Sequence, residues 1–190
     1  MKLLVLDNYD SFTYNLVHMF RSMNIDHEVY RNDKIIPEEA LSFDFIILSP
    51  GPGIPSEAGN MGKIIAACAG KKPILGICLG HQAIAEYLGA KLNNMSSVYH
   101  GVKNKINILS NEEIFEGIPE KIEVGRYHSW EVVREGLPEN ISITAEDKNG
   151  TIMALSDASQ KLYGIQFHPE SVMTEYGEEM IQNFLKIAQS

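Results

Sequence analysis

Residues 73–82 read Pro-Ile-Leu-Gly-Ile-Cys-Leu-Gly-His-Gln and join a short apolar run to a tight turn and the start of a helical pattern. The run ends at Ile77, Cys78 follows, and the spacing predicts a helix from His81 to Leu88. Glycines lie two positions before and two positions after the cysteine, as in a nucleophile elbow with sulfur in place of the hydroxyl. The stretch therefore predicts a buried strand that brings a cysteine to the edge of an α/β sheet.

The glycines and the helix indicate a reactive cysteine. In so tight a turn a Cβ at Gly76 or Gly80 would collide with backbone, and the nucleophile itself is held in a strained conformation. The N-terminus of the helix adds positive potential, which favours a thiolate. Most cysteines are instead small buried apolar residues, and Cys68, in a second helical segment, is interpreted in that way. Cys78 is predicted to be the nucleophile of an enzyme that breaks an amide or acyl bond.

Apolar runs and helical patterns alternate through the first half of the chain. Helical spacing predicts helices over 12–23, with Asp10 or Ser11 as N-cap, and over 61–69. Strands buried on both faces of a parallel sheet are predicted at 3–6, 45–48 and 73–77. The alternation predicts an α/β fold, an open and mostly parallel sheet with helices on both faces.

The second half consists mainly of short strand-like runs, which predict additional antiparallel strands. These runs lie at 103–109, 122–127, 141–146, 151–156 and 162–167. Residues 147–150, Asp-Lys-Asn-Gly, form a clear hairpin connection. Residues 177–188 predict a final amphipathic helix. Since no linker or repeat interrupts the pattern, residues 1–190 are expected to form a single domain.

Composition and charge argue against several classes of function. Sixteen basic and twenty-five acidic residues give a net charge of −9, which disfavours nucleic acid as a partner. No apolar stretch approaches the roughly 20 residues that span a bilayer, so no membrane contact is expected. The two cysteines have no metal-type partners and form no disulfide framework, so no metal site is expected. A cytoplasmic location follows from the free thiols.

A base for the cysteine is predicted just after the last strand-like run. His168 and Glu170 flank Pro169, which keeps the chain extended, so that both side chains face the same way. A carboxylate beside an imidazole fixes its tautomer and supports its charged form. Cys78, His168 and Glu170 are the predicted catalytic residues.

An oxyanion hole needs two backbone N–H donors beside the nucleophile. Leu79, the residue after the cysteine, is the first candidate donor. The loop 49–53, Ser-Pro-Gly-Pro-Gly, follows the strand 45–48 and reaches the same sheet edge, and Gly53 is the candidate for the second donor.

Five segments together carry a family resemblance that runs nearly end to end. They are 7–12 (Asp-Asn-Tyr-Asp-Ser-Phe), 49–53, 76–82 (Gly-Ile-Cys-Leu-Gly-His-Gln), 127–129 (Tyr-His-Ser) and 166–171 (Gln-Phe-His-Pro-Glu-Ser). The chain resembles the class I glutamine amidotransferases, and within them the small subunits of anthranilate synthase and aminodeoxychorismate synthase. The resemblance implies a three-layer, flavodoxin-like arrangement.

The resemblance also implies a reaction and a partner. Cys78 would attack the side-chain amide of glutamine, forming a γ-glutamyl thioester and releasing ammonia, while His168, oriented by Glu170, moves the protons. A chorismate-binding large subunit, either anthranilate synthase component I or aminodeoxychorismate synthase component I, would use the ammonia. Magnesium is expected only in that subunit, so this chain is expected to carry no cofactor. The residues implied to hold glutamine are Gly51, Pro52, Gly53, Gln82 and the backbone of Ser129 and Trp130.

The chain departs from the family in two places. Trp130 stands where leucine is usual, and residues 100–102, His-Gly-Val, replace His-Gly-Lys, so no role is assigned to Lys103. His81 and His128 are expected to line the site without doing chemistry. Structural or solvated roles are expected for His18 and His27.

Three alternatives accompany the leading prediction of a glutaminase subunit for anthranilate synthesis in the tryptophan pathway. The same chemistry can serve aminodeoxychorismate synthesis in the folate pathway. A free-standing γ-glutamyl hydrolase would pass the acyl group only to water. An inactive scaffold would bind and regulate a partner, but the intact set of Cys78, His168 and Glu170 argues against it.

Overall fold

A computed structural model describes residues 1–110 and 112–189, in which nine strands form one sheet. The strands are β1 (Leu3–Asp7), β2 (His27–Arg31), β3 (Phe45–Leu48), β4 (Ile74–Ile77), β6 (Val102–Ile108), β7 (Lys121–Arg126), β9 (Ser142–Asp147), β10 (Ile152–Asp157) and β11 (Leu162–Ile165). Their order is β2-β1-β3-β4-β11-β10-β9-β6-β7. Neighbours from β2 to β11 are parallel, and those from β11 to β7 are antiparallel. The α/β fold class is confirmed, and the later strands extend the same sheet.

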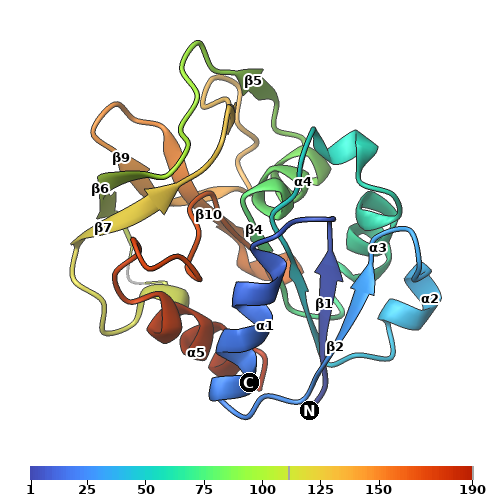
Figure 1. The fold of residues 1–190 in the computed structure, drawn as a ribbon. Helices are drawn as coiled ribbons and strands as arrows, with labels where there is room; N and C mark the ends of the chain where they lie inside the picture. Colours follow the sequence, from blue (N-terminus) through green and yellow to red (C-terminus); the bar gives the residue numbers. More distant parts are fainter. Residues whose placement is uncertain (111, 190) are drawn as a thin grey trace.

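Helices cover both faces of the sheet. On one face lie α1 (Thr13–Ser22) and α5 (Gly177–Ile187), seen in front of the sheet in Figure 1. On the other lie α2 (Pro37–Ala40), α3 (Met61–Cys68) and α4 (Leu79–Tyr87). Since successive side chains of a strand point to opposite faces, β1 sends Leu3 and Val5 into one core and Leu4 and Leu6 into the other.

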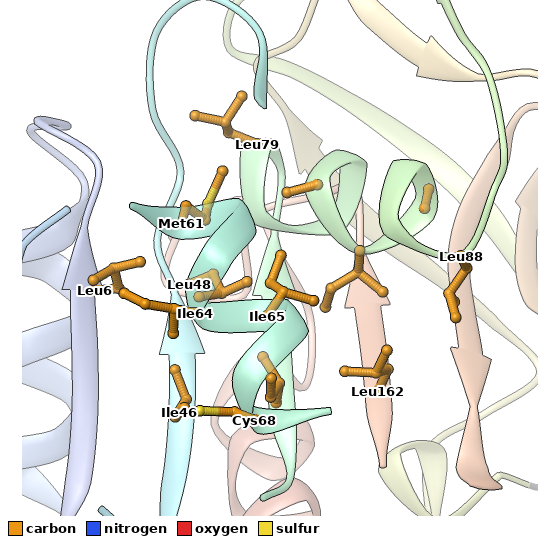
Figure 2. Packing of buried hydrophobic residues seen from close by; sticks show 14 of the residues in the cluster. Leu6, Ile46, Leu48, Met61, Ile64, Ile65, Cys68, Leu79, Leu88 and Leu162 are labelled. Carbon is orange, nitrogen blue, oxygen red and sulfur yellow. The ribbon is translucent and has the colours of Figure 1, made fainter. Parts of the chain in front are cut away.

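The second core, between the sheet and α3, shows why the central strands lack polar residues. Ile46 and Leu48 of β3 pack against the apolar side of α3, as Figure 2 shows. Cys68 belongs to this cluster and is completely buried, in agreement with its prediction as a core residue. Among the described residues no helix has the length and apolarity that a membrane span requires.

The structure corrects several local predictions. Helix α4 begins at Leu79, two residues before the predicted start, because Cys78 itself is the N-cap. Helix α1 has Phe12 at its N-cap, and Asp10 contributes by accepting a hydrogen bond from the Phe12 N–H at 2.7 Å. The elements that have no predicted range are short or exposed. They are β2, α2, a separate two-stranded sheet of β5 (Leu92–Asn94) and β8 (Trp130–Val132), and three 3-10 helices at Pro55–Glu57, Glu113–Phe115 and Ala158–Gln160.

Candidate active site

The elbow at Cys78 has the backbone strain that the glycine spacing predicts. Cys78 has a φ of 53° and a ψ of −99°, in a region that L-residues rarely adopt. A Cβ on Gly76 would lie 2.3 Å from the carbonyl carbon and oxygen of Gly80, and one on Gly80 would lie 2.6 Å from the carbonyl oxygen of Leu48. The turn therefore requires both glycines, and it places the sulfur at the carboxyl edge of the sheet.

His168 reaches the same edge from the neighbouring parallel strand. Strand β11 pairs with β4 so that Ile165 lies opposite Ile77, and the Cys78 N–H donates to the Ile165 carbonyl at 2.9 Å. Strand β11 ends at Ile165, and the chain then turns at 168–171 instead of staying extended as predicted, because the Ser171 N–H donates to the His168 carbonyl at 3.2 Å. Within this turn Nδ1 of His168 still lies 2.7 Å from Oε1 of Glu170. The structure thus brings together the three predicted catalytic residues at the ends of two adjacent strands, where open α/β sheets bind ligands.

The surroundings of His168 support a positive charge on its ring. The His168 side chain is 2% exposed and that of Glu170 is not exposed at all. Burial alone would lower the pKa of His168, but the nearby Cys78 and the hydrogen bond with the Glu170 carboxylate raise it to about 10. At neutral pH the imidazole is therefore protonated, with its Nδ1–H donated to Glu170.

Two aromatic rings hold the imidazole of His168 from its other sides. The ring centroid of Phe12 lies 5.0 Å from that of His168 and the ring of Tyr127 lies 4.9 Å away, both edge to face. The backbone is fixed as well, because the Thr174 hydroxyl donates to the His168 carbonyl at 2.6 Å. These contacts restrict the imidazole to one orientation.

The loop 49–53 packs against the start of α4 through its first glycine. A Cβ on Gly51 would lie 2.7 Å from Cδ2 of Leu79 and 2.6 Å from Cβ of Asn8. Asn8 holds the loop by donating its Nδ2–H to the Ser49 carbonyl at 2.8 Å, and its backbone N–H donates to Oγ of Ser49 at 2.8 Å. Gly51 and Leu79 are therefore in contact, as an oxyanion hole built from these two segments needs.

Pro52 and Gly53 form the exposed part of that loop. Gly53 has a φ of 72°, and a Cβ there would lie 2.5 Å from Oε2 of Glu57. The conformation favours glycine, and the nearest side chain is a carboxylate rather than a residue of the elbow. Of the two predicted oxyanion donors, Leu79 thus adjoins the nucleophile, whereas Gly53 lies beside Glu57.

Gln82 joins α4 to the segment that carries Ser129 and Trp130. Its Nε2 donates to the Trp130 carbonyl at 3.0 Å and to Oε1 of Gln166 at 3.1 Å. The contact to residue 130 is made by the backbone carbonyl, so that hydrogen bond does not depend on whether tryptophan or leucine stands there. Three of the predicted glutamine-binding positions, Gln82, Ser129 and Trp130, therefore lie together beside the elbow.

His81 and Lys103 lie in different surroundings. His81 is completely buried, and burial lowers its pKa to about 3, so it is neutral. Lys103 pairs with Glu123, with Nζ and Oε2 2.6 Å apart. The ring of His81 packs against Gly164 of β11 with no exposed surface, so His81 does not line an open pocket, which corrects the prediction for it.

Sequence reasoning missed several residues that build the site. Asn8 and Phe12 lie within the segment 7–12, which indicated only the family, and Gln166 lies in the strand-end segment 166–171. Arg126 was not predicted, although it is fully buried. A charged residue inside an apolar strand pattern, as in Val124-Gly125-Arg126, was the available signal.

The sequence and the fold are similar to those of one known family. A family model for class-I glutamine amidotransferases matches residues 4–188. "Aminodeoxychorismate/anthranilate synthase component 2" of Bacillus subtilis is 44% identical over 97% of this chain and 95% of its own length. "Anthranilate synthase component 2" of Pseudomonas aeruginosa is 43% identical over 97% and 94%. The crystal structure of a candidate GMP synthase protein from Thermoplasma acidophilum, 30% identical, has a TM-score of 0.89 and covers all of this chain, with 94% of its own length matched. With a family match that spans almost every residue, the chain belongs to the class-I glutamine amidotransferases.

Proposed function

We propose that this chain is the glutaminase subunit of an anthranilate synthase, which hydrolyses glutamine and delivers ammonia to a chorismate-binding large subunit. The observation that carries the proposal is the convergence of Cys78, His168 and Glu170 at the ends of two adjacent parallel strands. A cysteine, an imidazole and a carboxylate in this order provide a nucleophile, a proton carrier and a group that orients it.

In the proposed reaction the sulfur of Cys78 bonds to the amide carbon of the glutamine side chain. The C–N bond breaks as His168 gives its proton to the leaving nitrogen, so that ammonia departs and a γ-glutamyl thioester remains. Water then attacks the thioester while His168 takes its proton, which frees glutamate and restores the thiolate–imidazolium pair. The backbone N–H groups of Leu79 and of the loop 49–53 stabilise the negative charge on the carbonyl oxygen.

The proposed binding site for glutamine combines the loop and the segment after β7. Gly51, Pro52 and Gly53 lie on one side, and Gln82 with the backbone of Ser129 and Trp130 on the other. The contact between Gln82 and the Trp130 carbonyl supports this arrangement. We further propose that this chain uses no cofactor, that magnesium belongs to the partner, and that the complex works in the cytoplasm.

The names of the relatives support the choice of partner. The Bacillus subtilis and Pseudomonas aeruginosa proteins are both called component 2, which implies a second component. Because the Bacillus subtilis name includes aminodeoxychorismate, the same chain serving folate synthesis is the second candidate function. The partner, which binds chorismate, would determine the position of the new amino group.

The test is to measure glutamate release and aromatic amine formation by the purified chain, with and without a chorismate-binding component I and chorismate. We expect slow glutamate release by the chain alone, faster release with the partner, and the ortho-amino product. A para-amino product would indicate the folate role. Full activity without a partner, extending to longer γ-glutamyl chains, would indicate a hydrolase, and no release under either condition would leave only a scaffold.

The charge on His168 predicts the alkaline limit of the reaction. With the pKa of His168 raised to about 10, the ring is protonated at neutral pH and loses its proton as the pH rises through that value. We expect kcat/KM to fall above about pH 10, since no proton is then available for the leaving ammonia.

Glu170→Gln tests the cause of that limit. Gln keeps an oxygen that accepts from Nδ1–H but removes the negative charge, so the pKa of His168 should fall and the alkaline limb of the kcat/KM profile should move to lower pH. We expect a loss of about 10²- to 10⁴-fold in kcat. An alkaline limb at the same pH in both proteins would contradict the assignment of Glu170.

A further inference from the structure

A chain of buried side chains runs from the hairpin of the antiparallel strands to the proposed glutamine pocket. Nη1 of Arg126 donates to Oδ2 of Asp147 at 2.7 Å, and Nε of Arg126 donates to Nε2 of His128 at 3.0 Å. Nδ1 of His128 lies 2.8 Å from the Trp130 carbonyl, which also accepts from Gln82. Arg126 is not exposed at all, and Asp147 and His128 are each 4% exposed.

The hydrogen bonds define the tautomer of His128. The guanidinium of Arg126 has only donors, so Nε2 of His128 must be the acceptor and cannot carry a proton. The proton of the neutral ring is therefore on Nδ1, where it is donated to the Trp130 carbonyl. Burial and then the charge of Arg126 lower the pKa of His128 to about 4, so this form persists at neutral pH. A neutral ring also avoids a second positive charge near His168.

Three consecutive carbonyls of this segment have donors. The His128 carbonyl accepts from the Tyr99 N–H at 3.0 Å, and the Ser129 carbonyl accepts from the Met95 N–H at 2.8 Å. In a trans peptide the C=O and the following N–H point in opposite directions. Holding these two carbonyls toward the loop 95–99 therefore directs the N–H groups of Ser129 and Trp130 away from that loop.

The remaining carbonyl, that of Trp130, depends on side chains. His128 and Gln82 are its two donors. The ring of His128 is itself fixed from both sides, because it stacks on Tyr99 with ring centroids 5.5 Å apart and because Arg126 bonds to it. The guanidinium of Arg126 also lies over the Tyr99 ring at 3.7 Å. A rigid ring at this point fixes the last peptide plane of the segment.

We propose that His128 is a positioning residue for glutamine, which Arg126 holds as the Nδ1–H tautomer so that its proton fixes the backbone of Ser129 and Trp130 in the pocket. The proposal rests on the proposed function, since it requires that the backbone of Ser129 and Trp130 contacts the bound glutamine. His128 does not touch the reacting atoms in this assignment. Its loss should weaken substrate binding and leave the chemistry at Cys78 intact.

Two polar variants of the same residue separate the two hydrogen bonds. Gln in place of His128 has its terminal amide near the position of Nε2, so it can accept from Arg126 but loses the donor to the Trp130 carbonyl. Asn has its amide near Nδ1, so it keeps that donor. We expect His128→Gln to raise the KM for glutamine about tenfold with kcat changed less than about threefold, and His128→Asn to stay within about threefold of the parent in KM.

Chemical labelling of Cys78 provides a second measurement that does not need turnover. In His128→Gln, alkylation by iodoacetamide should proceed at the parent rate, whereas labelling by a glutamine-shaped diazoketone should slow about tenfold. Equal KM values in the two variants, or equal slowing of both reagents, would overturn the positioning role. A parent protein that releases no glutamate, with or without partner, would instead refute the proposed function.

Discussion

Replacing Cys78 with Ala should lower the rate of glutamine hydrolysis by at least about 10⁴-fold, because the thioester cannot form without the sulfur. The synthesis of the aromatic amine by the complex should then depend on added ammonium salts and no longer respond to glutamine. Release of labelled glutamate and formation of the amine, measured with each nitrogen source, report the two steps separately. Glutamine hydrolysis within about tenfold of the parent would contradict the assignment of the nucleophile.

The other cysteine provides the matched control. Cys68 is also buried and free, but it lies in α3, and burial raises the pKa of its thiol, which makes it unreactive. Cys68→Ala should keep full activity and lose about 1 kcal/mol of unfolding free energy through poorer packing. Cys78→Ala should instead lose its activity and keep its unfolding free energy. A loss of activity in Cys68→Ala that exceeds its loss of folded protein would argue against a purely structural role.

The backbone at Cys78 adds a stability measurement to this experiment. Ala keeps a Cβ and therefore keeps the strain at a φ of 53°, whereas Gly adopts that conformation without cost. Cys78→Gly should therefore be more stable to urea than Cys78→Ala, by about 1–3 kcal/mol at most. Both variants are expected to be inactive, so the comparison isolates the strain of the elbow from its chemistry.

The parts of the fold that the sequence predicted correctly depend on local pattern. Strands β1, β3 and β4 are buried on both faces and read as unbroken apolar runs. Strand β2 could be given no range from the sequence, because it is an edge strand that pairs only with β1 and its residues are half-buried or exposed. An edge strand has a partner strand on one side only. The side chains of β2 are also partly exposed, so no apolar run appears in the sequence at this place.

The residues of the site also fall into two groups, those that a local pattern predicts and those that it does not. Cys78 follows β4 directly, and His168 and Glu170 lie within five residues of the end of β11, so a strand end and a short spacing were enough to predict them. The hydrogen bonds of Arg126 to Asp147 and of Gln82 to Trp130 join positions that are 21 and 48 residues apart. A local periodicity cannot predict contacts between residues so far apart in the sequence, because these contacts form only when the sheet has assembled.

Replacing Gly76 with Ala tests the fold at its most crowded point. Strand β4 lies in the interior of the sheet between β3 and β11, and Gly76 faces Gly80 of α4. A Cβ would lie 2.3 Å from the Gly80 carbonyl and 2.6 Å from the His81 nitrogen. These are backbone atoms, so relief requires α4 to move away from β4, which would uncover the core beneath it.

The expected cost of Gly76→Ala exceeds about 4 kcal/mol of unfolding free energy, a large share of the roughly 5–15 kcal/mol that holds a domain together. Little folded protein should remain, as circular dichroism during urea titration would show. Gly62, in α3, is the matched control, because a Cβ there would meet no heavy atom of residues 1–110 and 112–189 within 4 Å, apart from its chain neighbours and the backbone of its own helix. Gly62→Ala should instead stabilise the protein by about 0.5–1 kcal/mol through better helix propensity. If the two variants unfolded within about 1 kcal/mol of each other, the elbow would be able to accommodate a side chain, and the close approach of β4 to α4 would not be what determines the position of Cys78.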